Sequence, residues 1–204
     1  MTYPFRAGAL PALLAVTAVV LSADNAAAQD LHDSRRPSPV GIAKTFVGDV
    51  YVKVTYGRPY VRGRNVFGNP ADGGTYLVPF GELWRTGANE ATEITVTGPV
   101  LIAGKRLEAG TYSIFTVPGA SNWTVRFNTG LGMDGTGRLA AETRRFTQSY
   151  DEADDVLVVE IPSGSLSEVV DQFTIAFETA EDGAHMVLSW ERTGVRIPIA
   201  AAGM

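Results

Sequence analysis

The densest polar chemistry of the sequence lies between residues 57 and 92, in a stretch rich in glycine, arginine and asparagine. Arginine presents a planar guanidinium that binds carboxylates, phosphates or sugar hydroxyls and also stacks on aromatic rings. The pair Gly87-Ala88 is small enough to let a ligand or another backbone approach closely. We therefore predict a pocket for a small polar or anionic ligand, with the candidate residues Arg58, Arg64, Trp84, Arg85, Asn89, Glu90 and Thr92.

The same residue types also build internal ion pairs, so a structural interpretation stands beside the binding one. Arg58 and Arg85 would pair with Glu82 or Glu90 and tie the long loop onto the end of the domain. A loop of this length without such a clamp is uncommon. The protein would then be a structural or interaction domain of the cell envelope.

A third alternative is a glycan-directed hydrolase that uses Glu82 and Glu90. Glycosidases need two carboxyl groups roughly 5 to 9 Å apart across a cleft. Glu90 and Glu93 are a poor pair if they share a strand, because their odd spacing points them to opposite faces.

Other kinds of site find little support in the sequence. It contains no cysteine, and its two histidines, His32 and His185, are too far apart to suggest a zinc site. The acidic run 151–155 lacks the spacing of a calcium loop and is typical of a solvated turn. The run Gly130–Gly135 reads G-x-G-x-x-G, but the strand before it alternates apolar and polar residues, unlike a dinucleotide-binding strand. We expect neither a metal nor a cofactor.

The elements that must position the candidate residues are strands, because the apolar residues recur with a period of two. Nine short β segments separated by turn residues indicate an all-β domain, a single antiparallel β-sandwich or barrel-like fold. They cover residues 50–56, 94–96, 100–102, 111–117, 123–128, 156–161, 173–177, 186–190 and 195–199. The spacing of Leu139, Thr143, Phe146 and Tyr150 predicts one short amphipathic helix over 138–150.

The length of 204 residues suits one domain, and the net charge of −5 argues against a nucleic-acid partner. Arg6, the apolar stretch Ala9–Leu21 and the small residues Ala26–Ala28 are typical of a secretory signal peptide. We expect a signal peptide at 1–28, a flexible lead-in at 29–44 and the domain at 45–204, located in a bacterial periplasm or secreted. An uncleaved N-terminal anchor is the alternative. No other apolar stretch is long enough to span a membrane, and the oligomeric state stays open.

Four runs of the sequence are similar to a known family, and they are Val54–Gly68, Leu77–Ile94, Ala109–Pro118 and Trp123–Asn128. They resemble the bacterial DUF 2911 family, a domain of unknown function, and the block Trp84–Thr92 is the most specific of the shared motifs. The resemblance covers about Val50 to Ile199 and implies an exported, mostly β, single-domain protein. The family has no established reaction, so it supplies no catalytic residues. The chain departs from the family pattern at Asn69–Thr75, which looks like an insertion, and in the longer link Asn128–Tyr150.

Overall fold

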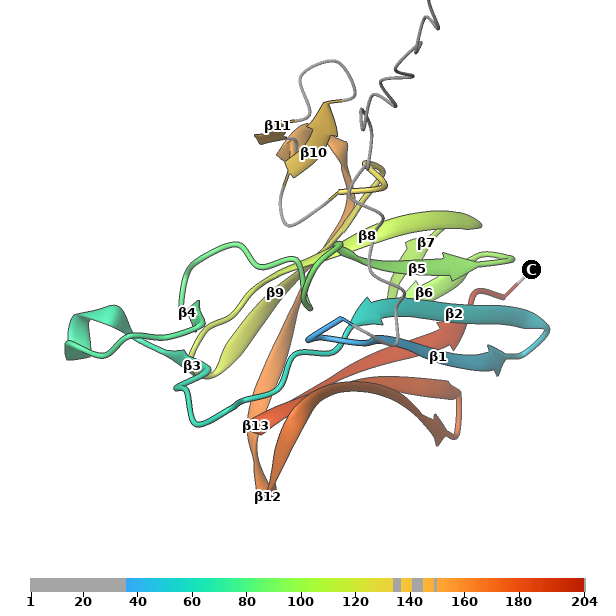
Figure 1. Ribbon diagram of the computed structural model, residues 1–204. Coiled ribbons are helices and arrows are strands. Elements are labelled where there is room, and N and C mark those ends of the chain that lie inside the picture. The colour runs from blue at the N-terminus through green and yellow to red at the C-terminus, as the bar shows by residue number, and fades with distance from the viewer. Residues whose placement is uncertain (1–35, 134–136, 141–144, 149, 204) are drawn as a thin grey trace, which may run out of the picture. The chain divides into compact units, whose positions relative to one another are not determined.

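The computed structural model describes residues 36–133, 137–140, 145–148 and 150–203. The predicted signal peptide at 1–28 therefore lies outside the described residues. Nine strands form one antiparallel sheet in the order β1-β2-β5-β8-β9-β12-β13-β6-β7, and the described residues contain no α-helix (Figure 1). The prediction of an all-β protein is confirmed.

The strands of this sheet differ greatly in length. They are β1 (Val40–Val47), β2 (Val50–Gly57), β5 (Thr92–Val96), β6 (Val100–Ile102), β7 (Lys105–Leu107), β8 (Gly110–Val117), β9 (Asn122–Asn128), β12 (Asp155–Ala180) and β13 (Gly183–Ala201). Two small two-stranded sheets lie outside it, β3 (Phe67–Gly68) with β4 (Val78–Pro79) and β10 (Gly137–Ala140) with β11 (Arg145–Gln148). Short 3-10 turns span Pro70–Asp72 and Glu152–Asp154.

The strand β12 belongs to both halves of the sheet. Its first part, Asp155–Pro162, pairs with β9, and from Ser163 onward it pairs with β13. The register shifts between Ser165 and Thr174 mark bulges, which bend a strand and increase its twist. The segments predicted as separate strands at 156–161 and 173–177 are thus parts of one strand, and those at 186–190 and 195–199 both belong to β13.

Two boundaries differ from the sequence-based expectation. The helix expected over 138–150 is wrong for the described part of that range, because β10 and β11 pair there as antiparallel strands with Leu139 opposite Phe146. Four periodic positions do not distinguish a short helix from a strand. Here the backbone of a neighbouring strand accepts and donates the hydrogen bonds that a helix would form within itself.

Strand β1 begins at Val40, inside the expected lead-in at 29–44, because it pairs along its whole length with β2 and buries Ala43 and Val47.

A cluster of aromatic rings fills the core between the two halves of the sheet. Trp84 stacks on Trp190 with ring centroids 5.8 Å apart and lies 5.2 Å from Phe173. Trp123 and Phe67 complete the cluster, with centroids 5.0 Å apart. Because Phe67 and Trp84 come from the long segment 57–92, this segment is anchored in the core of the domain and is more than a surface loop.

Candidate functional site

The segment Trp84–Thr92, here called the site loop, is held in one conformation by its own hydrogen bonds. The Nε1 of Trp84 donates to the carbonyl of Gly87 at 3.0 Å, and the Oγ1 of Thr92 donates to the carbonyl of Thr86 at 2.6 Å. Thr86 and Asn89 both adopt a left-handed backbone, with φ of 58° and 63°. A β-branched residue rarely adopts this conformation, and such strain persists only where the surroundings impose it.

The end of β2 fixes the position of the site loop through two glycines. The N–H of Ala88 donates to the carbonyl of Gly57 at 3.3 Å. A Cβ atom on Gly57 would lie 1.9 Å from the carbonyl oxygen of Ala88, and one on Gly87 would lie 2.9 Å from the carbonyl oxygen of Gly57. The small residues at 87 and 88 therefore admit another backbone, which is one of the two uses that the sequence predicts for them.

Four of the seven candidate residues line one cavity of about 300 Å³, here called the arginine cavity. Arg64, Arg85, Trp84 and Asn89 contribute to it, together with residues of the segment before β1, of β4 and of β13. The remaining lining residues are Ser38, Pro59, Leu77, Val78, Gly87, Ala88 and Trp190. The described residues of this lining thus include two arginines and no carboxylate.

Arg64 is positioned at this cavity by its own turn. Its Nε donates to the carbonyl of Val61 at 3.0 Å and its Nη2 donates to the carbonyl of Tyr60 at 2.7 Å. No described residue forms a hydrogen bond with its Nη1, and the side chain is exposed to solvent. The guanidinium is therefore oriented by two bonds and retains N–H groups for a ligand.

The other three candidate residues have structural contacts. Arg58 donates from Nε to the carbonyl of Phe173 at 3.2 Å and from Nη2 to Thr174 Oγ1 at 3.0 Å, which ties the end of β2 to β12. Thr92 is buried within the site loop. A clamp thus exists, but Arg58 uses a carbonyl and a hydroxyl of β12 where the sequence predicted a glutamate.

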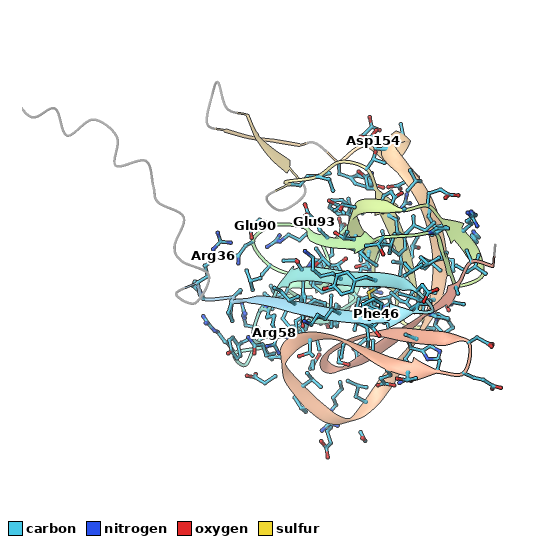
Figure 2. The ribbon with its side chains drawn as sticks, turned by 90° about the vertical axis from the view of Figure 1, so that its right-hand side faces the viewer. Arg36, Phe46, Arg58, Glu90, Glu93 and Asp154 are labelled. Carbon is cyan, nitrogen blue, oxygen red and sulfur yellow. The ribbon has the colours of Figure 1, made fainter. Side chains whose placement is uncertain are left out.

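Glu90 forms an ion pair that the sequence did not predict. The Nη1 of Arg36 lies 2.6 Å and 2.7 Å from the two carboxylate oxygens of Glu90, so a residue far away in the chain reaches the site loop (Figure 2). Arg36 lies in a polar, proline-marked segment, and no signal in that segment indicates its partner.

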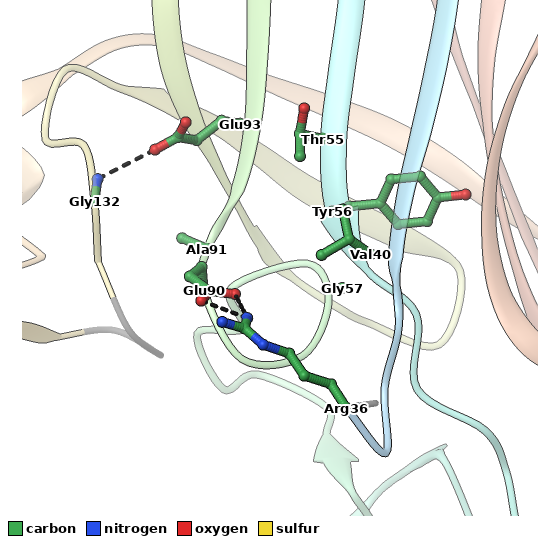
Figure 3. A pocket seen from close by; sticks show the side chains of 9 residues that line it. All are labelled: Arg36, Val40, Thr55, Tyr56, Gly57, Glu90, Ala91, Glu93 and Gly132. Atoms are coloured by element: carbon green, nitrogen blue, oxygen red, sulfur yellow. Dashed lines mark hydrogen bonds and ion pairs between the residues drawn. The ribbon is translucent and has the colours of Figure 1, made fainter. Parts of the chain in front are cut away.

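A second cavity, of about 280 Å³, lies at this ion pair, and we call it the glutamate cavity (Figure 3). Arg36, Glu90 and Glu93 line it, and the Oε1 of Glu93 accepts a hydrogen bond from the N–H of Gly132 at 3.1 Å. Glu90 and Glu93 reach the same cavity because Glu90 precedes β5 and only Glu93 lies in that strand. Glu82 lines neither the arginine cavity nor the glutamate cavity.

A comparison with known protein families matches residues 38–199, which is most of the chain, to the family described as "Protein of unknown function (DUF2911)". The chain belongs to the DUF2911 family. No curated protein and no solved structure matches it. The DUF2911 match includes the site loop, which borders both cavities. It also includes all strands of the nine-stranded sheet except the last residues of β13.

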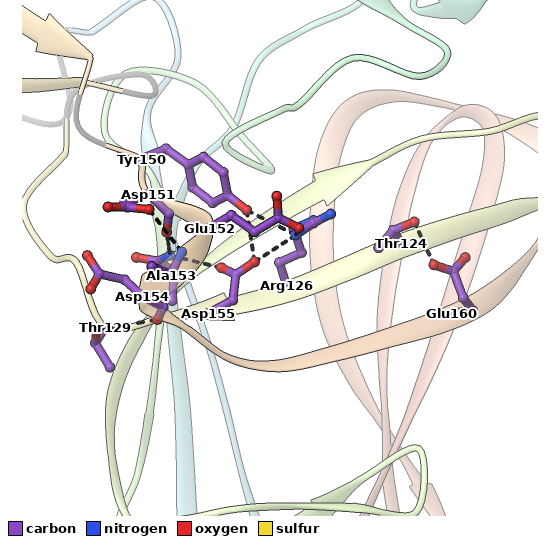
Figure 4. A network of polar contacts seen from close by, with 11 residues as sticks. Thr124, Arg126, Thr129, Tyr150, Asp151, Glu152, Ala153, Asp154, Asp155 and Glu160 are labelled. Carbon is purple, nitrogen blue, oxygen red and sulfur yellow. Dashed lines mark hydrogen bonds and ion pairs between the residues drawn. The ribbon is translucent and has the colours of Figure 1, made fainter.

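A separate polar network of the DUF2911 domain lies where β9 meets the start of β12 (Figure 4). The carboxylate of Asp155 is 2.8 Å from Arg126 Nη1 and accepts hydrogen bonds from Tyr150 Oη and Asn128 Nδ2, each also at 2.8 Å. Burial, reinforced by the bond to Asp155, raises the pKa of Tyr150 to about 12. The hydrogen bond to Asp155 also raises the pKa of Arg126, so this guanidinium keeps its positive charge.

The acidic run 151–155 is engaged in this network and in a turn. Asp151 caps the 3-10 turn Glu152–Asp154 through the N–H of Ala153. Within the described part of the chain, no group of three or more histidine, cysteine or acidic side chains is placed to hold a metal ion. The described residues also include no helix with the length and apolar character needed to cross a membrane.

The glycine run Gly130–Gly135 lies partly outside the described residues. Its first glycine accepts a hydrogen bond from the buried Ser113, and the next described element is the strand β10. His32 also lies outside the described residues, whereas His185 lies on β13.

Proposed function

We propose that this DUF2911 protein is an exported, non-catalytic binding module that holds a small anionic ligand in the arginine cavity. The observation that carries the proposal is the convergence of Arg64, Trp84, Arg85 and Asn89 on one concave surface. Arg64 meets there three residues of the site loop, whose backbone is left-handed at Thr86 and Asn89 and is held by internal hydrogen bonds. Such preorganisation is typical of binding sites, because it lowers the entropy lost when a ligand is held.

The charge of the arginine cavity indicates the class of ligand. Among the described residues of its lining, Arg64 and Arg85 carry charge and none is an aspartate or glutamate, although acidic residues exceed basic ones in the whole chain by 22 to 17. Trp84, Trp190 and Leu77 supply apolar surface beside the guanidinium groups. A compact carboxylate or phosphate with a small apolar or sugar part fits this combination.

The export part of the proposal is supported by the sequence. A charged start, a thirteen-residue apolar core and an Ala-Ala-Ala end resemble a secretory signal. A periplasmic or secreted location would bring the arginine cavity into contact with small solutes or glycans outside the cytoplasm.

A structural role in the envelope is the second candidate, and the contacts of Arg58 favour it. Arg58 bridges β2 and β12 without facing either cavity. A hydrolase based on Glu82 and Glu90 is favoured less, because the two carboxyl groups do not share either cavity.

Thermal unfolding with a panel of solutes tests the binding proposal. We expect at least one of phosphate, citrate, glucuronate or glucose 6-phosphate to raise the Tm, whereas neutral glucose does not. A ligand at one hundred times its Kd stabilises the folded state by about 2.7 kcal/mol. Arg64→Ala should abolish the shift, and Arg64→Lys should restore only part of it, because lysine keeps the charge but loses the planar fork.

Arg106→Ala is the matched control for these variants. Arg106 on β7 is exposed and pairs with the nearby Glu108 at 2.6 Å, so its loss removes the same charge outside the described lining of the arginine cavity. An anion-induced shift that is equal in Arg64→Ala and Arg106→Ala, or a panel in which no anion raises the Tm, contradicts the proposal.

A further inference from the structure

Four consecutive residues before β1 are each held by a different contact with the candidate site. We call this segment, Arg36–Pro39, the strap. Arg36 pairs with Glu90, as described above. The carbonyls of the next three residues accept hydrogen bonds from Arg62 Nη2 at 3.1 Å, Asn89 Nδ2 at 3.0 Å and the N–H of Arg58 at 2.9 Å.

These contacts show a surface that fits an extended peptide segment. Three donors reach three successive backbone carbonyls, while one carboxylate selects an arginine side chain. Pro37 and Pro39 suit such a segment, because proline favours an extended backbone and has no N–H that would need a partner. The residues that recognise the strap come from the turn after β2 and from the site loop.

The strap also forms part of both cavities. Ser38 lines the arginine cavity and Arg36 lines the glutamate cavity. Figure 3 shows the Arg36 side chain extending to Glu90 at the edge of the glutamate cavity. Asn89 and Glu90 are adjacent in the site loop, and each faces a different cavity while it holds the strap. A movement of this one segment therefore changes the walls of both cavities together.

The attachments of the strap are weak in comparison with those of the strands. The Glu90 side chain is 51% exposed and that of Arg36 is 14% exposed, so solvent and salt screen their ion pair from the side of the carboxylate. None of the four strap residues belongs to the hydrophobic core. Segments held by few buried apolar contacts are those that open locally while the rest of a domain stays folded.

We propose that the strap is a detachable segment bound by the surface of Arg58, Arg62, Asn89 and Glu90, and that its docking completes the walls of both cavities. The Arg36–Glu90 ion pair sets the fraction of molecules in which the strap is docked. The effect on a ligand in the arginine cavity rests on the proposed function, but the docking of the strap does not.

Because the chain has no cysteine, one introduced thiol reports on the strap alone. The experiment measures the rate at which a thiol reagent modifies Ser38→Cys in the otherwise unchanged chain. We expect Glu90→Gln in this background to increase the rate about two- to fivefold. Loss of a solvent-screened ion pair changes the fraction of molecules with an undocked strap by about this factor. Salt at about 1 M should produce a similar increase, and the increase should be absent in Glu90→Gln.

Two further variants make the result specific. Glu108→Gln removes another exposed carboxylate that pairs with an arginine, Arg106, and it should leave the modification rate unchanged. Asn89→Gly tolerates the left-handed backbone and removes the bond to the carbonyl of Ser38, so it should also increase the rate. Far-UV circular dichroism establishes that each variant is folded.

Equal modification rates in Glu90→Gln, Asn89→Gly and Glu108→Gln overturn the proposal of a detachable strap. That result leaves the anion panel unaffected. Conversely, a panel without any anion-dependent Tm shift contradicts the proposed binding function and leaves the labelling result standing. The two proposals therefore fail independently.

Discussion

At the scale of single residues, arginine performs three different tasks in this protein. Arg58 joins two strands through a carbonyl and a hydroxyl, Arg64 is oriented toward a cavity, and Arg126 belongs to a charged network. The network of Arg126 differs from the other two cases because its partner carboxylate is buried. The Asp155 side chain is only 4% exposed, so its charge depends on Arg126, Tyr150 and Asn128 in place of water.

We predict that Asp155→Asn lowers the free energy of unfolding by about 3 kcal/mol, because it leaves the partly buried Arg126 without its main counter-charge. Glu152 also pairs with Arg126, at 2.9 Å, but it is exposed to solvent. Glu152→Gln should therefore cost less than about 1 kcal/mol. Urea denaturation of the two variants measures the difference, and equal losses would show that burial of the carboxylate is unimportant.

At the scale of elements, the site loop depends on the close approach of its backbone to the end of β2. Gly57 and Gly87 allow this approach, and the left-handed residues Thr86 and Asn89 turn the loop so that adjacent side chains reach different cavities. A side chain at the contact with β2 would displace the loop as a unit, because its internal hydrogen bonds hold it together.

We predict that Gly57→Ala lowers the free energy of unfolding by at least about 2 kcal/mol, because the new methyl group meets the carbonyl of Ala88. Gly164→Ala is the matched control, since a Cβ there meets no atom within 4 Å and the backbone is not left-handed. It should leave the stability unchanged or raise it by up to about 1 kcal/mol. Chemical denaturation compares the variants, and the hypothesis fails if the order is reversed.

At the scale of the whole molecule, the aromatic cluster joins the two halves of the bent sheet. Phe173 lies on the second part of β12, Trp123 on β9 and Trp190 on β13, while Trp84 arrives from the site loop. All three tryptophans of the chain belong to this cluster. The core, the corner of β12 and the site loop are therefore expected to unfold together.

We predict that Phe173→Ala lowers the free energy of unfolding by about 3–5 kcal/mol, as removal of a fully buried aromatic ring does. Phe46 on β1 is 67% exposed (Figure 2), and Phe46→Ala should cost less than about 1 kcal/mol. Denaturation followed by tryptophan fluorescence and by circular dichroism should show one coincident transition. Separate transitions would show that the aromatic cluster does not couple the two halves.

The local pattern of apolar residues predicted most of the strands but not their connections. Alternation identifies Val52 and Val54 or Val125 and Phe127 as buried residues, because their burial depends only on which face of a strand they occupy. The same signal does not show that the strands near Ile161 and Phe173 are one continuous strand. The helix expected at 138–150 was wrong for a similar reason, since short-range spacing contains no information on a pairing partner.

The candidate site was predicted in part, and its limits have the same origin. The residue types in 57–92 indicate a polar site, and four of the seven candidates do line one cavity. Arg36, Ser38 and Glu93 were missed, because each reaches the site only after β1, β2 and β5 have paired.

The sequence by itself determined the all-β class, the family and the segment that carries the candidate site, because strand alternation and a specific motif are local properties of the chain. Only the tertiary structure decided which arginine bridges strands and which lines a cavity, and that Glu90 pairs with Arg36. These outcomes depend on contacts between residues far apart in the chain. Such contacts are set by the register of the sheet and the bend of β12, which no local pattern contains.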